Sequence, residues 1–219
     1  MKVDLRLYAL LDPAVSGGHK LTELARRIAG STTVVQLRDK HGSTRAMIEE
    51  ARALHAVLAP AGIPLLINDR VDVALAAGAE GVHIGQDDMS VDDARRLLGP
   101  KALIGLSVKT VAQAQAAPLD LLDYVAIGGV YATTSKENTA APIGLAGLRT
   151  IAQTIRSRAP AYPVCAIAGI DKSNAGDVIA AGADGVAVIS ALSLAPDPAA
   201  AARDLRGVVD DALARRGAA

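Results

Sequence analysis

Phenylalanine and tryptophan are absent from this sequence of 219 residues, which has only four tyrosines and one cysteine. The single cysteine, Cys165, excludes an internal disulfide, and we expect it to be a small apolar core residue in a reducing compartment such as the cytoplasm. Apolar residues make up 51% of the chain and are mostly Ala, Val, Leu and Ile. We therefore expect a core of many small aliphatic layers rather than a few aromatic rings.

The sequence also lacks an excess of charge of either sign, because 23 acidic residues balance 23 basic ones. This balance gives no support for binding to nucleic acid or to an anionic membrane surface. No apolar run has the length of a membrane span, and the start of the chain has no signal-peptide pattern. We predict a single cytoplasmic domain over residues 1–219; the sequence leaves open whether copies associate into a homo-oligomer.

Short apolar runs rich in β-branched residues alternate with Ala-rich segments that have helical apolar spacing. The runs cover residues 6–11, 33–37, 64–67, 81–84, 102–106, 124–127, 163–167 and 185–189. They are nearly continuous in apolar character, as is typical of strands covered on both faces. Eight strand–helix units in a chain of this length predict a (β/α)8 TIM barrel, with a doubly wound open sheet as the main alternative.

An internal similarity supports the barrel. The stretch "AAGAEGVHI" (76–84) resembles "AAGADGVAVI" (180–189), about half a chain length further on. In both stretches a glycine follows an Ala-rich helix, as a C-cap, and an acidic turn leads into a strand. Because such turns are common, the similarity is moderate evidence for matching units in the two halves.

Polar residues collect directly after the predicted strands, and in a parallel barrel these strand ends form one rim that carries the active site. Asp69 and Asp88 follow neighbouring strands. Two carboxylates with few soft ligands nearby suit Mg²⁺, which keeps several waters and binds phosphate oxygens as well. The alternative is that one or both aspartates cap the helix that follows.

Gln36, Arg38 and Lys40 alternate along one strand end, so their side chains can lie on one face. Beside a metal, such a pair of cations indicates a clamp for a polyphosphate. A basic strand end paired with Asp39 is the alternative. The loops after the last two strands, around Gly169 and after Ile189, are typical of a second phosphate site in barrels.

The segment 128–144 is too long for an ordinary strand–helix connection. It contains "TTSK", which supplies hydroxyls and the ammonium of Lys136, and a mobile lid could bring that ammonium onto a leaving diphosphate. An inert insertion is the alternative. His83 ends a strand, and we interpret it as a structural histidine with satisfied hydrogen bonds.

At these residues the chain resembles the thiamine-phosphate synthase family. The motifs "QLRDK", "NDR", "GVHIGQDD", "GLS", "TTSK", "AGI" and "VIS" occur in the family's order and spacing. The resemblance implies a (β/α)8 barrel that joins hydroxymethylpyrimidine diphosphate to hydroxyethylthiazole phosphate, two small-molecule substrates, with release of pyrophosphate. No nucleic acid or membrane partner is implied.

The resemblance also implies roles for particular residues. Asp69 and Asp88 would bind Mg²⁺. Gln36, Arg38, Lys40 and Asn68 would hold the pyrimidine diphosphate, and Ser107 and Lys136 would touch its diphosphate as the catalytic pair. Thr133, Ser135, Gly169, Ile189 and Ser190 would hold the thiazole phosphate. Ser135 stands where the family often has threonine, so the hydroxyl is kept.

Two other functions fit the same barrel. A related thiazole tautomerase is expected to use a histidine after the fifth strand, where this chain has Ser107-Val108-Lys109. A non-catalytic sensor of phosphorylated ligands has little reason to keep two metal carboxylates and a lysine in a lid. Both comparisons favour the synthase.

Overall fold

The computed structural model describes residues 3–135 and 141–218, in which eight parallel strands close into a barrel. Each strand pairs with the next along the chain, and the first pairs with the last, so the predicted (β/α)8 barrel is confirmed and the open sheet is excluded. Each predicted apolar run overlaps one strand. The strands are β1 (Leu7–Leu11), β2 (Val34–Leu37), β3 (Leu65–Asn68), β4 (Gly81–Ile84), β5 (Leu103–Val108), β6 (Tyr124–Gly128), β7 (Val164–Ile167) and β8 (Gly185–Val188).

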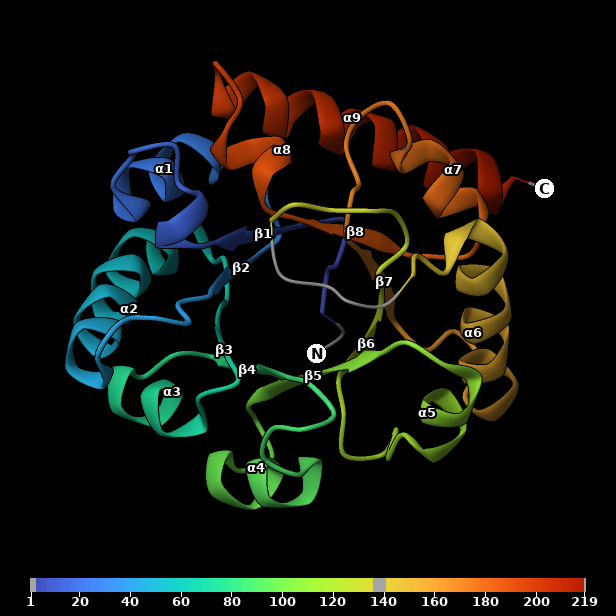
Figure 1. The fold of residues 1–219 in the computed structure, drawn as a ribbon, viewed down its shortest axis with the longest axis horizontal. Helices are drawn as coiled ribbons and strands as arrows, with labels where there is room; N and C mark the ends of the chain where they lie inside the picture. The colour runs from blue at the N-terminus through green and yellow to red at the C-terminus, as the bar shows by residue number, and fades with distance from the viewer. Residues whose placement is uncertain (1–2, 136–140, 219) are drawn as a thin grey trace.

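Helices surround the strands as an outer ring (Figure 1). They are α1 (Leu21–Ile28), α2 (Thr44–Leu58), α3 (Val71–Ala77), α4 (Val91–Leu98), α5 (Val111–Ala116), α6 (Gly144–Arg158), α7 (Ala175–Ala180), α8 (Ser190–Ser193) and α9 (Pro198–Gly217), with short 3-10 turns η1 (Pro13–Val15) and η2 (Ala59–Ala61). The long helix α9 packs against α1, α7 and α8 and so covers the seam where β8 meets β1. Within the described residues, no helix is both long and apolar enough to cross a membrane.

Two separate apolar clusters hold the barrel together. The larger one lies between strands and helices and is aliphatic, as predicted. The smaller one fills the barrel interior around the rings of Tyr8 and Tyr124, whose centroids are 5.9 Å apart in an edge-to-face arrangement. The expectation of small aliphatic layers in place of aromatic rings is therefore wrong for the interior, where two tyrosine rings pack together. Gly105 makes room there, because a Cβ at this position would lie 2.0 Å from the Tyr124 ring.

The N-terminal ends of the strands are closed by a repeated arrangement of hydrogen bonds. The residue before each even-numbered strand donates its backbone N–H to a carbonyl at the start of the preceding strand, at 2.7 to 3.0 Å; this carbonyl belongs to the first residue of β1, β3 and β7 and to the second residue of β5. Its side chain accepts the backbone N–H of that same residue, at 2.8 to 3.1 Å. These four terminal clamps join Thr33 to Leu7, Glu80 to Leu65, Asp123 to Ile104 and Asp184 to Val164.

The terminal clamps explain the internal similarity in the sequence. Glu80 and Asp184 are the acidic residues of its two stretches, and both act as clamps at the N-terminal face. Arg156 and Arg216 both pair with Asp184, which neutralises that carboxylate. At this face of a barrel, polar residues serve stability, whereas the opposite face carries function.

Candidate active site

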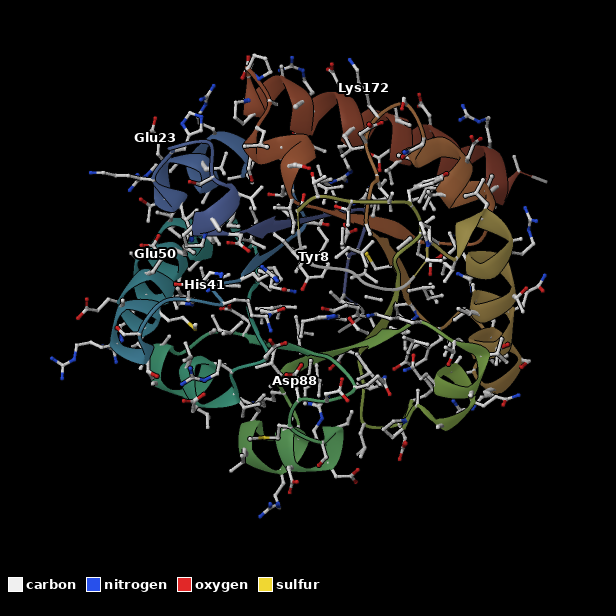
Figure 2. The ribbon with its side chains drawn as sticks, viewed as in Figure 1. Tyr8, Glu23, His41, Glu50, Asp88 and Lys172 are labelled. Atoms are coloured by element: carbon white, nitrogen blue, oxygen red, sulfur yellow. The ribbon has the colours of Figure 1, made fainter. Side chains whose placement is uncertain are left out.

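The C-terminal ends of the strands bring the predicted site residues to one mouth of the barrel. Figure 2 shows Asp88 in the loop between β4 and α4, inside the ring of helices, and Tyr8 near the barrel axis. Exposed residues such as Glu23 and Lys172 lie outside, over the helices. The mouth therefore collects polar groups around an apolar interior.

Asp69 and Asp88 come together at this mouth. Burial raises the pKa of the Asp69 carboxyl, and the neighbouring carboxyl of Asp88 raises it further. Lys40 opposes this shift, because its ammonium forms an ion pair with the Asp69 carboxylate. One Asp88 oxygen accepts the N–H of Gly85 at 2.7 Å. Two neighbouring carboxylates, one of which raises the pKa of the other, form a place for a cation.

Neither aspartate caps the helix that follows it. The residue before α3 is Arg70, which provides no side-chain cap, and α4 is capped by Ser90, whose hydroxyl accepts the Asp93 N–H. Asp69 adopts a positive φ of 61°, a conformation that costs free energy for a residue other than glycine. The capping alternative therefore does not describe this pair.

The two cations that follow β2 each pair with a different carboxylate. Arg38 forms an ion pair with Asp12, and Lys40 with Asp69. The alternative partner, Asp39, instead accepts the backbone N–H groups of His41 and Gly42. Asp12, which is only 2% exposed, was not among the site residues predicted from the sequence. It follows β1 directly in "LLD", so the rule that gathered the other strand-end residues would also have found it.

A small cavity opens on the barrel axis, just inside the mouth. Its polar lining contains Gln36, Arg38, Asn68 and Ser107, all predicted to hold one substrate, together with Tyr8 and His83. Both ring nitrogens of His83 have hydroxyl partners, Tyr124 at 2.9 Å and Ser107 at 2.8 Å, which confirms its interpretation as a satisfied histidine. Cys165 is fully buried in the barrel interior, as predicted.

A larger cavity of about 490 Å³ lies over β7 and β8. Its lining contains all five residues predicted to hold the second phosphate: Thr133, Ser135, Gly169, Ile189 and Ser190. The hydroxyls of Ser135 and Ser190 are 3.1 Å apart, which ties the loop after β6 (the β6 loop) to the start of α8. Lys136 lies outside the described residues, so its predicted role stays a prediction.

Gly169 is required by the shape of this cavity. Its φ is +66°, and a Cβ at this position would lie 2.4 Å from the carbonyl oxygen of Ala132. The preceding Ala168 has a φ of 88°, which places two consecutive residues in the left-handed region. Backbone strain of this kind is concentrated at functional sites.

Fold and site together define the class as a (β/α)8 barrel with its polar site at the C-terminal mouth. The thiamine monophosphate synthase family model matches residues 7–192. The chain is 52% identical to the thiamine-phosphate synthase of Agrobacterium fabrum over 98% of both chains, and 51% identical to that of Chloroflexus aurantiacus over 94% of both. It is also similar to the solved structure of thiamine phosphate pyrophosphorylase from Pyrococcus furiosus, with a TM-score of 0.84 and 34% identity over 97% of this chain and 98% of that one.

The chain belongs to the thiamine monophosphate synthase family. The two relatives described above are both named thiamine-phosphate synthase, and the chain is accordingly a transferase that acts on small molecules.

Proposed function

We propose that this chain joins hydroxymethylpyrimidine diphosphate to hydroxyethylthiazole phosphate, with Mg²⁺ as cofactor, to give thiamine phosphate and pyrophosphate. The carrying observation is that paired carboxylates, two cations and a separate hydroxyl-lined cavity share one barrel mouth. Two anionic substrates need two such regions side by side.

The residues at the mouth fit a magnesium ion. Among residues 3–135 and 141–218 there is no cluster of three or more His, Cys, Asp or Glu side chains suited to a metal. Asp69 and Asp88 alone suit Mg²⁺, because this ion usually takes one or two carboxylates and completes its shell with water and substrate phosphate oxygens. When bound, it would supply positive charge to the diphosphate oxygens and relieve the repulsion between the two carboxylates.

The axial cavity, of about 50 Å³, forms the floor of the region that we assign to the pyrimidine diphosphate. Gln36, Asn68 and Ser107 would offer hydrogen bonds to the heterocycle and its substituents. Arg38, which lines the same cavity, and Lys40, which pairs with Asp69, would meet the diphosphate. Asp12 positions Arg38 through their ion pair, so that the guanidinium is oriented before the substrate arrives. We assign Ser107 and Lys136 to the departing diphosphate.

The cavity over β7 and β8 suits the thiazole phosphate. Thr133 and Ser135 offer hydroxyls, and the backbone at Gly169, Ile189 and Ser190 can approach the phosphate closely. Both cavities include Ile167, Ala187 and Ile189 in their linings, so the two substrates would meet above these side chains.

The reaction needs orientation and charge stabilisation more than a strong base. The bond from the methylene carbon to the diphosphate oxygen breaks, and its electron pair leaves with pyrophosphate. The electron-rich aminopyrimidine delocalises the positive charge on the methylene, and the lone pair of the thiazole nitrogen then forms the new C–N bond. Water would capture the same cation, so the chain must exclude it while both rings are bound.

The direct test incubates the purified protein with both phosphorylated heterocycles, with and without Mg²⁺, and measures pyrophosphate and thiamine phosphate. We expect both products in equal amounts, and only when Mg²⁺ is present. Pyrophosphate without thiamine phosphate would instead indicate hydrolysis. Absence of both products in the complete mixture would refute the function. A cytoplasmic location and self-association of the chain stay predictions from the sequence.

A further inference from the structure

A chain of buried polar groups crosses the barrel interior beneath the axial cavity. Gln36 Nε2 donates to the Tyr8 hydroxyl, which lies 2.9 Å from the Tyr124 hydroxyl. The Tyr124 hydroxyl lies 2.9 Å from His83 Nδ1, and His83 Nε2 lies 2.8 Å from Ser107 Oγ. We call these five residues the buried relay. It begins on β2 and ends on β5, and Tyr8, near the barrel axis in Figure 2, is its second member.

Elementary proton counting gives the buried relay a direction. Burial raises the pKa of Tyr8 and of Tyr124 well above the usual range, so each hydroxyl keeps its one proton. An amide nitrogen can only donate. Tyr8 therefore accepts from Gln36 and donates to Tyr124, and Tyr124 donates to His83 Nδ1. In a neutral imidazole the other nitrogen then carries the proton, so His83 Nε2 donates to Ser107 Oγ.

The two ends of the buried relay present opposite hydrogen-bonding groups to the axial cavity, an acceptor at Gln36 and a donor at Ser107. Gln36 Oε1 is buried and has no hydrogen-bond partner among the described residues, although the residue lines the axial cavity. A buried acceptor without a partner costs free energy until a donor fills it. Ser107 lines the same cavity and, since it accepts from His83, keeps its own proton for a ligand. One end thus needs a donor from the ligand and the other needs an acceptor.

Reversing the Gln36 amide would reverse every bond in the relay. Gln36 Oε1 would then accept from Tyr8, Tyr8 from Tyr124, and Tyr124 from His83 Nδ1–H. His83 Nε2 would accept the Ser107 proton, which leaves Gln36 offering a donor to the cavity and Ser107 only an acceptor. Because each hydroxyl has a single proton, the ends cannot reverse independently, and the three middle residues couple them.

We propose that Tyr8, Tyr124 and His83 are positioning residues that lock Gln36 as an acceptor and Ser107 as a donor, and thereby select an aminopyrimidine over its oxo analogue. The proposal rests on the proposed function and adds a source of specificity to it. An amino group donates to Gln36 Oε1, and a diphosphate oxygen accepts from Ser107, so one substrate satisfies both ends in the same relay direction. An oxo group would place two acceptors together at Gln36, and turning the amide would also remove the donor at Ser107.

Tyr124→Phe is the decisive variant, because Tyr124 is fully buried and outside the cavity lining, so it can act on specificity only through the relay. The change keeps the ring against Gly105 and removes only the hydroxyl. We expect the ratio of kcat/KM for the amino substrate to that for the oxo analogue to fall by about tenfold or more, the scale of one buried hydrogen bond. Tyr8→Phe, which frees the Gln36 amide directly, should reduce the ratio similarly.

Tyr162→Phe is the matched control. It also removes a shielded tyrosine hydroxyl, one that donates to the carbonyls of Leu119 and Leu122 outside the barrel interior. We expect this variant to lose thermal stability and to keep the wild-type ratio. An unchanged ratio in folded Tyr8→Phe and Tyr124→Phe proteins would show that the relay is structural only, and would overturn the proposal while wild-type turnover upheld the function.

Two further measurements test the buried relay independently of the reaction. Calorimetric titration with the unphosphorylated aminopyrimidine alcohol and its oxo counterpart compares binding without any reaction, so the relay can be judged even if the wild type makes no product. Equal affinity of the wild type for both would count against the proposal. Nitrogen NMR of the wild type should show the His83 proton on Nε2; a proton on Nδ1 would reverse the relay and overturn it.

Discussion

At the scale of single residues, the features that suit the site to binding reduce the stability of the free protein. Asp69 and Asp88 repel each other, and Asp69 also has a positive φ, so this corner of the mouth is unfavourable in the free protein. Such cost is typical of a binding site whose ligand supplies the missing interaction. Lys40 relieves part of the repulsion by pairing with Asp69, and it is well placed to turn to an anionic substrate.

We predict that Asp88→Asn loses Mg²⁺-dependent turnover by about 100-fold or more, because several kcal/mol of charge stabilisation depend on the metal. Its melting temperature without Mg²⁺ should equal or exceed that of the wild type, because the repulsion that raises the pKa of Asp69 is gone. Product assays and thermal unfolding measure the two effects. Full Mg²⁺-dependent activity in the variant would remove Asp88 from the metal site.

Lys136→Ala addresses a residue whose role stays a prediction. If its ammonium acts on the departing diphosphate, turnover should fall more than substrate affinity, because the interaction strengthens as negative charge develops. Steady-state kinetics with a separate binding measurement distinguish the two. A change in affinity alone would make Lys136 a contact to the bound substrate rather than a catalytic group.

At the scale of elements, the loop after β7 shows why a glycine can be fixed by its neighbours. Gly169 and Gly78 both have positive φ, +66° and +71°, but only Gly169 has backbone close to the space that a Cβ would fill. Gly78 caps α3 with open space around it. A comparison of Gly78 with Gly169 therefore separates the free-energy cost of a left-handed backbone from the cost of steric crowding around an added Cβ.

We predict that Gly78→Ala costs about 1 kcal/mol of unfolding free energy, the cost of the left-handed conformation, and leaves kinetics unchanged. Gly169→Ala should cost more, about 2–3 kcal/mol, and raise the KM for the thiazole phosphate, because the β6 loop must move away from the β7 loop. Denaturant unfolding and kinetics measure both. Equal effects of the two variants would show that the close contact with Ala132 has no importance.

The strands were predictable from the sequence because each is a short apolar run between turn signals, and eight of them leave few architectures for 219 residues. The position of the site followed from a general rule about strand ends. The buried relay did not, because Tyr8 and Tyr124 are 116 positions apart and nothing local indicates that their hydroxyls meet. Three of the four terminal clamps were likewise visible only as an acidic residue before a strand, and Thr33 gave no such signal, since the partners of all four lie on the preceding strand.

At the scale of the whole molecule, the barrel separates chemistry from stability between its two faces. The mouth contains the carboxylate pair and the cations, whereas the N-terminal face contains the terminal clamps and their arginines. Asp184 is an example from the N-terminal face: its carboxylate accepts the Val164 N–H and pairs with Arg156 and Arg216.

We predict that Asp184→Ala lowers the free energy of unfolding by about 2–4 kcal/mol, because a strand N–H and two guanidinium groups lose their partner. The kcat and KM of the folded variant should match the wild type. Asp204→Ala is the control, because within residues 3–135 and 141–218 its half-exposed carboxylate makes only long surface pairs, and we expect this change to affect stability little. A loss of turnover in folded Asp184→Ala would show that the two faces are coupled.

The terminal clamps determine where the chain could be cut into two fragments that still reassemble into the barrel. Each clamp lies within one strand pair, so the ring consists of four quarters that each complete their own first hydrogen bonds. A cut between quarters, near Gly99, leaves two intact clamps in each fragment, and the separately produced halves should reassemble on mixing. A cut within a quarter, near Gly78, parts Glu80 from Leu65, and those fragments should complement each other less well.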